Sequence, residues 1–188
     1  MSKKVLVIGA TGYLGGKVVQ GLLTHGKTVR ALVRPNTDAS ALEKLGVEIM
    51  RGDMMNKTSL IPALQNMDAL ITTANGYSQR KKGDTITTDD IGNRNLVDAA
   101  KATKLPLFIF TGILTAEKAR SVPHFYQKAL TEEYIEKSNV PFISLRRAVF
   151  LILCSDSASK TSEMESFAQW QMYVQWHPQF CLKMSHTF

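Results

Sequence analysis

The feature that most constrains this chain is a glycine turn near its start, in the stretch VLVIGATGYLGG over residues 5–16. Four apolar residues, Val5–Ile8, run directly into Gly9, Gly12 and Gly15, and an amphipathic segment follows at once. This order predicts a buried strand, a tight turn and the start of a helix. Such a turn directs backbone N–H groups and the positive end of a helix dipole toward one place, which suits a phosphate.

Each glycine of the turn has its own expected role. Gly9 permits the sharp turn, Gly12 lets the backbone approach a pyrophosphate, and Gly15 lets the helix pack close to the strand. Thr11 can add a hydroxyl group to the phosphate site. The spacing G-x-x-G-x-x-G is looser than G-x-G-x-x-G, and a plain tight turn is the alternative. The strand before the turn and the helix after it favour a site for a dinucleotide cofactor over a plain tight turn.

The composition is that of one globular domain. The chain has 188 residues, of which 44% are hydrophobic, so it can bury a sizeable core but is short for a two-domain enzyme. No apolar run is long enough to span a bilayer, and no signal segment precedes the first expected strand. We therefore expect a cytoplasmic protein without a membrane partner.

The charge distribution and the cysteine spacing argue against a nucleic-acid interface and against a metal site. The net charge is +7, but the positive residues are spread along the chain, and the dense cluster Arg80–Lys82 reads as a solvated loop. We therefore expect no nucleic-acid partner. Cys154 and Cys181 have neither metal-ligand nor redox spacing, so no metal site is expected.

Apolar and amphipathic segments alternate along the chain. The expected strands are Val5–Ile8, Thr28–Val33, Val47–Met50, Ala69–Thr73, Leu107–Thr111 and Phe142–Leu145. The expected helices are Gly12–His25, Ala39–Leu45 capped by Asp38, Ser59–Asn66 capped by Ser59 with Pro62 in its first turn, Asp89–Lys101 and Phe125–Lys137. The polar stretch Asn75–Asp84 is expected to be a loop. Alternation of this kind predicts an α/β fold with a doubly wound parallel sheet, whose ligands bind beyond the carboxyl ends of the strands.

The end of the second expected strand indicates which dinucleotide would bind. An acidic residue there would accept a hydrogen bond from an unmodified adenosine ribose, but this chain has Arg34 instead. A guanidinium group can pair with a 2′-phosphate, which favours NADP(H) over NAD(H). Arg30, inside the strand, is a second candidate, and a surface arginine without a ligand is the alternative.

Further cofactor contacts are expected at the ends of the third and fourth strands. Asp53, with Met54 beside it, would lie against the adenine, although a turn or cap role for Asp53 is nearly as well supported. Thr73 and Ala74 are small and leave room for the ribose and phosphates.

The candidate catalytic residues lie between the fifth strand and the following helix. Thr111 ends the expected strand, and His124 and Lys128 share one face of the helix because they are four residues apart. Lys128 could donate a hydrogen bond to the nicotinamide ribose, and an adjacent imidazole could pass on a proton. An ordinary polar helix start with a solvated lysine explains the spacing equally well.

These residues resemble a known family. The stretches GATGYLG, LVR, GD, SVPHFYQK and EEYIEKSNVPFISLR are similar to the NmrA-like group of atypical short-chain dehydrogenase/reductase relatives, which includes isoflavone-reductase-like enzymes. The resemblance covers residues 3–147 and implies an NADP(H)-binding Rossmann domain. It implies a pyrophosphate site at Gly9, Thr11, Gly12, Tyr13, Leu14 and Gly15, a 2′-phosphate site at Arg34 and a nicotinamide site at Lys128. The ordinary short-chain dehydrogenase pattern has a tyrosine four residues before this lysine, where this chain has His124.

The last part of the sequence departs from the family. Members continue the sixth strand with Arg-Pro-Gly, whereas this chain has Arg146, Arg147 and Ala148, and members carry a much longer substrate-binding part. We therefore expect an NAD(P)-binding domain over residues 1–148 and a short atypical tail over residues 149–188, with the substrate-binding region largely absent.

Three functions follow from these expectations. The first is an NADPH-dependent oxidoreductase that reduces a small carbonyl or quinone-like acceptor, with the cofactor carrying the reaction. The second is a non-catalytic NADP(H)-sensing regulatory protein of the NmrA type, which would bind a protein partner. The third is an inactive truncated form. A Rossmann fold by itself does not separate them.

Overall fold

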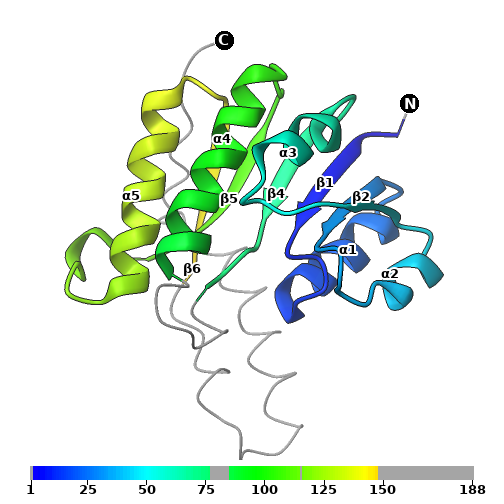
Figure 1. Cartoon of the computed structure of the whole chain (residues 1–188), viewed down its shortest axis with the longest axis horizontal. Helices are drawn as coiled ribbons and strands as arrows, with labels where there is room; N and C mark the ends of the chain where they lie inside the picture. Colours follow the sequence, from blue (N-terminus) through cyan, green and yellow to red (C-terminus); the bar gives the residue numbers. More distant parts are fainter. Residues whose placement is uncertain (1, 77–84, 115, 148–188) are drawn as a thin grey trace, which may run out of the picture.

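The six expected strands form one parallel sheet in the order β3-β2-β1-β4-β5-β6. The structure is a computed structural model that describes residues 2–76, 85–114 and 116–147. In it the sheet has helices on both faces, as Figure 1 shows. This strand order is that of dinucleotide-binding Rossmann domains, so the predicted doubly wound α/β fold is confirmed.

The element bounds agree with the expected alternation. The strands are β1 (Lys4–Ile8), β2 (Thr28–Val33), β3 (Glu48–Arg51), β4 (Ala69–Thr72), β5 (Phe108–Ile113) and β6 (Phe142–Arg147). The α-helices are α1 (Tyr13–Thr24), α2 (Ser40–Lys44), α3 (Lys57–Leu64), α4 (Asn93–Ala102) and α5 (Pro123–Ser138). A π-helix, η2 (Thr85–Gly92), leads directly into α4, and a short 3₁₀ helix, η3 (Ala116–Lys118), follows β5.

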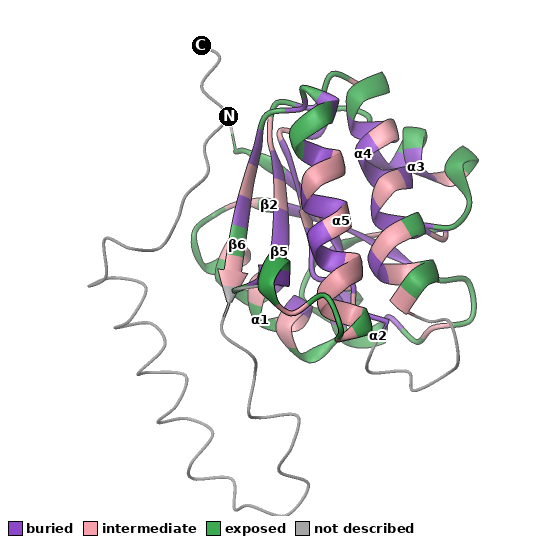
Figure 2. Ribbon diagram, turned by 90° about the vertical axis from the view of Figure 1, so that its left-hand side faces the viewer, coloured by how far each residue is buried: buried purple, intermediate pink, exposed green. Residues whose placement is uncertain are grey.

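The sheet separates two hydrophobic layers. Successive residues of a strand point to opposite faces, so Leu6 and Ile8 of β1 join one layer and Val5 and Val7 join the other. The first layer packs against α3, α4 and α5, and the second packs against α1 and α2. Figure 2 shows buried residues along the strands and on the α5 side that faces them. The first layer spans the strands from β2 to β6, whereas the second is centred on β1 and β2, and Leu145 of β6 is exposed. Where both faces are covered, the strands read as continuous apolar runs.

The glycine turn has the expected geometry. Gly9 has a φ of +80°, a left-handed conformation that side chains rarely adopt. A Cβ atom at Gly15 would lie 2.0 Å from the carbonyl oxygen of Gly9, so α1 packs backbone against backbone on the end of β1. The structure thus bears out the sharp turn at Gly9 and the close helix packing at Gly15.

The start of α3 differs from the sequence expectation. Its N-cap is Asn56, whose side chain accepts a hydrogen bond from the backbone N–H of Thr58, whereas Ser59 was expected to be the cap. The Ser59 hydroxyl instead donates to the carbonyl oxygens of Asp53 and Asn56. Pro62 consequently lies inside the helix rather than in its first turn. Asn is as strong a cap as Ser, so local preference could not choose between them.

Three further bounds differ from those expected. The helix expected over Asp89–Lys101 is α-helical only from Asn93, and Asp89 lies within the π-helical turn Thr85–Gly92 that leads into it. Strand β5 continues to Ile113, because Thr111, Gly112 and Ile113 all pair with β6, so Thr111 does not end it. For α2, the N-cap is Ala39, although the Asp38 carboxylate accepts a hydrogen bond from the Ser40 N–H.

Parts of the expected organisation lie outside the described residues. The loop expected over Asn75–Asp84 is described only as far as Gly76. The tail expected over residues 149–188 also falls outside them, and so does the cluster Arg80–Lys82. The proposed domain boundary therefore stays a prediction.

We expect Gly15→Ala to lower the free energy of unfolding by about 1–3 kcal/mol, because the new methyl group would collide with backbone rather than with a flexible side chain. The matched control is Gly21→Ala in the same helix, where a Cβ atom would meet nothing within 4 Å. This control should raise stability by about 0.5–1 kcal/mol. Urea unfolding of both variants checks this, and equal effects would contradict the packing argument.

Candidate functional site

The expected cofactor residues of β1 and β4 meet at the carboxyl edge of the sheet. Strand β1 lies between β2 and β4, so the strand order changes direction beside it, and ligands of open α/β sheets bind at such a point. The Thr73 hydroxyl donates to the carbonyl oxygen of Ile8 at 2.9 Å. A Cβ atom at Gly9 would lie 2.7 Å from that hydroxyl and 3.2 Å from the Ala74 nitrogen. Gly9, Thr73 and Ala74 are thus brought together as expected.

The amino end of α1 suits an anion. Its N-cap, Gly12, has an extended backbone and makes no side-chain cap hydrogen bond, and no acidic residue lies in the first turn. The nearest described atom to a Cβ placed on Gly12 would be the Gly9 carbonyl oxygen, at 3.3 Å. Thr11 and Tyr13 are exposed on either side. Helix N–H groups that lack a capping side chain are satisfied by water or by a ligand, and phosphate is the usual one.

Two guanidinium groups lie at the carboxyl ends of β2 and β3. Arg34 directly follows β2 and is exposed, which both a ligand contact and a plain surface arginine would give. Arg51, which pairs with Val33 across the two strands, donates to the carbonyl oxygens of Thr37 at 2.6 Å and of Arg34 at 3.3 Å. Arg51 therefore supports the loop that carries Arg34.

Arg30 was the second candidate for the 2′-phosphate, and its guanidinium is engaged elsewhere. It forms an ion pair with Glu48 at 2.9 Å and donates to the carbonyl oxygen of Ala63 at 2.9 Å. These contacts tie β2 to β3 and to α3. The structure therefore assigns Arg30 a structural role.

The two residues expected near the adenine have local partners. The Asp53 carboxylate accepts a hydrogen bond from the Met55 N–H at 2.9 Å, which is the turn role that the sequence left open. Met54 is buried, and its side chain packs against Gly92, where a Cβ atom would lie 2.7 Å from the Met54 methyl group. Met54 thus connects the loop after β3 to the start of α4.

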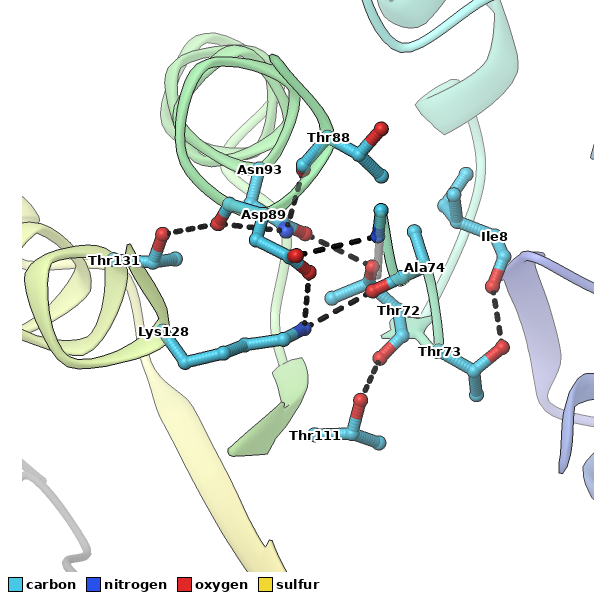
Figure 3. A network of polar contacts seen from close by, with 11 residues as sticks. Ile8, Thr72, Thr73, Ala74, Thr88, Asp89, Asn93, Thr111, Lys128 and Thr131 are labelled. Atoms are coloured by element: carbon cyan, nitrogen blue, oxygen red, sulfur yellow. Dashed lines mark hydrogen bonds and ion pairs between the residues drawn. The ribbon is translucent and has the colours of Figure 1, made fainter. Parts of the chain in front are cut away.

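Lys128 is fully buried and forms an ion pair with Asp89, a residue that the sequence analysis did not single out. The Lys128 ammonium lies 3.3 Å from Asp89 Oδ1 and donates to the Ala74 carbonyl oxygen at 3.0 Å (Figure 3). It also lies 4.8 Å from the centre of the Phe110 ring. The side chains of Lys128 and Asp89 are 2% and 0% exposed, so neither is the solvated residue that a plain helix start would carry.

The backbone around Asp89 is fixed by further buried polar contacts. The Thr131 hydroxyl and the Asn93 amide both donate to the Asp89 carbonyl oxygen, and the Gly76 N–H donates to the Asp89 carboxylate. Asn93 in turn accepts from the Thr72 hydroxyl at 3.0 Å. Figure 3 shows this network linking η2, α4 and α5 to the end of β4. It holds Asp89 in place from three elements.

The other two catalytic candidates differ in accessibility. The Thr111 hydroxyl is buried and donates to the Thr72 carbonyl oxygen at 2.9 Å, so its proton is engaged. His124 is half-buried in the first turn of α5, with its ring edge-on to Phe125. Burial lowers the pKa of the His124 imidazole below its ordinary 6.5, while the Asp89 carboxylate opposes this shift and Lys128 adds to it.

Burial also dominates the ionisation of Asp89. It raises the pKa of the Asp89 carboxyl above its ordinary 3.8, and the Lys128 ammonium and the Gly76 N–H work against that rise. A carboxyl group with a raised pKa in a buried site is one mark of a functional position, although buried structural ion pairs share it.

A second buried ion pair lies one turn along α5. Glu132 accepts hydrogen bonds from the Ser144 hydroxyl and, at 3.0 Å, from the Arg146 guanidinium. Gly112 leaves room for this contact, because a Cβ atom there would lie 2.8 Å from the Glu132 carboxylate. The pair joins α5 to β6 and points away from the glycine turn toward the edge strand.

Metal ligands and membrane-spanning helices are two other features that would bear on function. No group of three or more His, Cys, Asp or Glu side chains in that part of the chain could hold a metal ion. No helix there is both long enough and apolar enough to cross a membrane.

A sequence model of the NmrA-like family matches residues 1–166. The chain belongs to the NmrA-like family. The match includes the glycine turn, Arg34, Asp89 and Lys128, so the site described above lies within the family domain.

Curated relatives and solved structures agree with this assignment. The chain is 38% identical over 138 residues to the photosystem II assembly factor Ycf39 of Cyanophora paradoxa, covering 73% of this chain and 43% of the relative. It is 32% identical over 151 residues to Ycf39 of Synechocystis, covering 79% and 45%. Among solved structures it is similar to Citrobacter triphenylmethane reductase complexed with NADP(H), with 30% identity and a TM-score of 0.70 over 80% of this chain and 51% of that one.

These comparisons also bound what can be carried over. The chain spans about half of the length of these relatives or less. A similar solved structure holds NADP(H), the cofactor expected from Arg34, whereas the two curated relatives are described as assembly factors. The comparisons therefore show the family and the class of cofactor.

The pKa of His124 gives a testable pH dependence. An unfolded chain takes up the imidazole proton near pH 6.5, and the folded chain takes it up only at a lower pH, so the unfolded state binds more protons in between. The contribution of His124 to the free energy of unfolding should therefore fall as the pH drops from about 7 to about 5. His124→Gln should flatten this decrease in urea unfolding, and an unchanged slope would contradict it.

Proposed function

We propose that this chain binds NADP(H) at its glycine turn and is an NADPH-dependent oxidoreductase that reduces a small carbonyl or quinone-like acceptor. The observation that carries the proposal is the amino end of α1, which has no capping side chain and stands beside a glycine turn with the required backbone geometry. The likeness to a reductase complexed with NADP(H) supports it. The residues present fit the cofactor, because an anion supplies what the missing cap would supply.

Separate groups of residues would hold separate parts of the cofactor. The diphosphate would be held by the backbone of the turn, at Gly9, Thr11, Gly12, Tyr13, Leu14 and Gly15. The exposed guanidinium of Arg34 would pair with the 2′-phosphate, and Arg51 would keep the Arg34 loop in position. Asp53 and Met54 would border the adenine, and Thr73 and Ala74 would border the ribose and phosphates.

The bound cofactor would supply a hydride, and the chain would supply orientation and a proton. Lys128 would orient the nicotinamide ribose from the end of β4, where it already contacts the Ala74 carbonyl oxygen. His124 suits proton donation better than Thr111 does, because the Thr111 proton is donated to Thr72. A small molecule would be the partner of this function.

The alternative is a non-catalytic NADP(H)-binding protein that acts through a protein partner. The likeness to Ycf39 favours it, because that relative is described by its role in assembly and not by a reaction. The same cofactor residues would serve both functions, and only the acceptor separates them. An inactive truncated form and a cytoplasmic location also stay predictions.

We expect NADPH to bind the wild-type chain and to be oxidised when a suitable quinone or aldehyde is present. Binding is measured by the change in NADPH fluorescence, and turnover by the loss of NADPH absorbance over a panel of acceptors. Binding without turnover across the panel would favour the non-catalytic alternative. The absence of binding would overturn both functions, since both depend on the glycine turn.

Arg34→Asp should reverse the cofactor preference, because a carboxylate repels the 2′-phosphate and accepts a hydrogen bond from an unmodified ribose. The ratio of NADPH to NADH affinity should fall by at least about tenfold, which corresponds to about 1.4 kcal/mol. The control Lys101→Asp changes the net charge equally, at the exposed last turn of α4. It should leave the ratio unchanged. An unchanged affinity ratio in Arg34→Asp would show that Arg34 does not contact the 2′-phosphate.

A further inference from the structure

We propose that Asp89 is the positioning residue of this site, and that its carboxylate holds the Lys128 ammonium against the end of β4 so that the lysine meets the nicotinamide ribose in one orientation. This inference rests on the proposed function, because it assumes that NADP(H) binds at the glycine turn. It assigns a role to the one buried carboxylate that contacts Lys128 in the described part of the chain.

The first argument is geometric. A lysine side chain is a flexible four-carbon stem, and its ammonium has no fixed position unless its partners hold it. Here two partners hold it: the Ala74 carbonyl oxygen accepts a hydrogen bond at 3.0 Å, and the Asp89 carboxylate forms an ion pair at 3.3 Å. Ala74 belongs to the predicted ribose and phosphate contacts. The ion pair therefore fixes the ammonium at the place where the proposed cofactor would pass.

The second argument concerns how firmly Asp89 is itself held. Its carbonyl oxygen accepts from Thr131 of α5 at 2.6 Å and from Asn93 of α4 at 3.2 Å, and its carboxylate accepts from the Gly76 N–H at 3.2 Å. It lies in the π-helical turn η2, and such turns occur often at functional sites. A carboxylate anchored in this way can hold a lysine in place without moving itself.

The competing explanation is that the ion pair only stabilises the fold. Binding of two different ligands distinguishes this structural role from a positioning role. NADPH contains the nicotinamide ribose, whereas adenosine 2′,5′-bisphosphate contains only the adenosine half with its 2′-phosphate. We expect Asp89→Asn to weaken NADPH binding about tenfold, because the Lys128 ammonium would no longer be oriented to donate a hydrogen bond to the nicotinamide ribose. Binding of the bisphosphate should change by no more than about twofold. General loss of structure would weaken both ligands together.

The matched control is Glu132→Gln, which removes the buried carboxylate of α5 that pairs with Arg146 of β6. Asp89→Asn leaves the buried Lys128 ammonium without its carboxylate partner, and Glu132→Gln leaves Arg146 with Glu117 at 3.8 Å, so both variants should lose thermal stability. Only Asp89→Asn should change the ratio of NADPH to bisphosphate affinity. Equal changes of that ratio in the two variants would overturn the proposal.

A double-mutant cycle tests whether Asp89 acts through Lys128. Lys128→Met should change the affinity ratio as much as Asp89→Asn does, and the double variant should change it no further, because the two residues form one unit. The double variant also removes both buried charges, so it should fold even if Asp89→Asn alone does not. Additive effects, or a wild-type ratio in Asp89→Asn, would overturn the inference alone. A wild-type chain that binds neither ligand would overturn the proposed function with it.

Discussion

The contact on which the rest of this structure depends is that of α1 with the end of β1, where a carbonyl oxygen lies too close to Gly15 for any side chain to fit. This contact brings the amino end of the helix to the carboxyl edge of the sheet. It therefore places uncapped backbone N–H groups beside the ends of β1 and β4. The proposed phosphate site is a consequence of how tightly two backbones pack, not of any one polar side chain.

The other half of the site is held by charge. Helix α5 presents Lys128 and Glu132 to the interior one turn apart, and each meets an opposite charge from a different element. A buried ion pair adds little to stability compared with apolar residues in the same place. Removing only one partner is strongly destabilising, because the other charge is then left buried without its partner. The pair at Lys128 joins α5 to η2 beside the end of β4, and the pair at Glu132 joins α5 to β6. Together they set the position of the helix that carries both His124 and Lys128.

Several candidate site residues could be proposed from the sequence because their expected roles are local. The sharp turn at Gly9 and the close packing at Gly15 follow from three-residue spacing after an apolar strand. The expected 2′-phosphate contact of Arg34 follows from its place at the end of β2 and stays a prediction. Asp89 could not be found in this way, since its partner Lys128 is 39 positions further along the chain and nothing in the local sequence marks it as buried. Arg51 was missed for the same reason, because its contacts with the Arg34 loop depend on the pairing of β2 with β3. The predicted N-cap of α3 was wrong because Asn and Ser are equally good N-cap residues.

The sequence by itself determined the alternation of strands and helices, the glycine turn and the cationic end of β2, since each depends on residues close together in the chain. Tertiary structure decided which polar groups are buried, which is why Lys128 is an enclosed ion-pair partner and not a solvated helix residue, and why the hydroxyl of Thr111 is engaged inside β5. The physical reason is that burial and charge pairing depend on which elements pack together, and packing is set by the whole sheet and its covering helices.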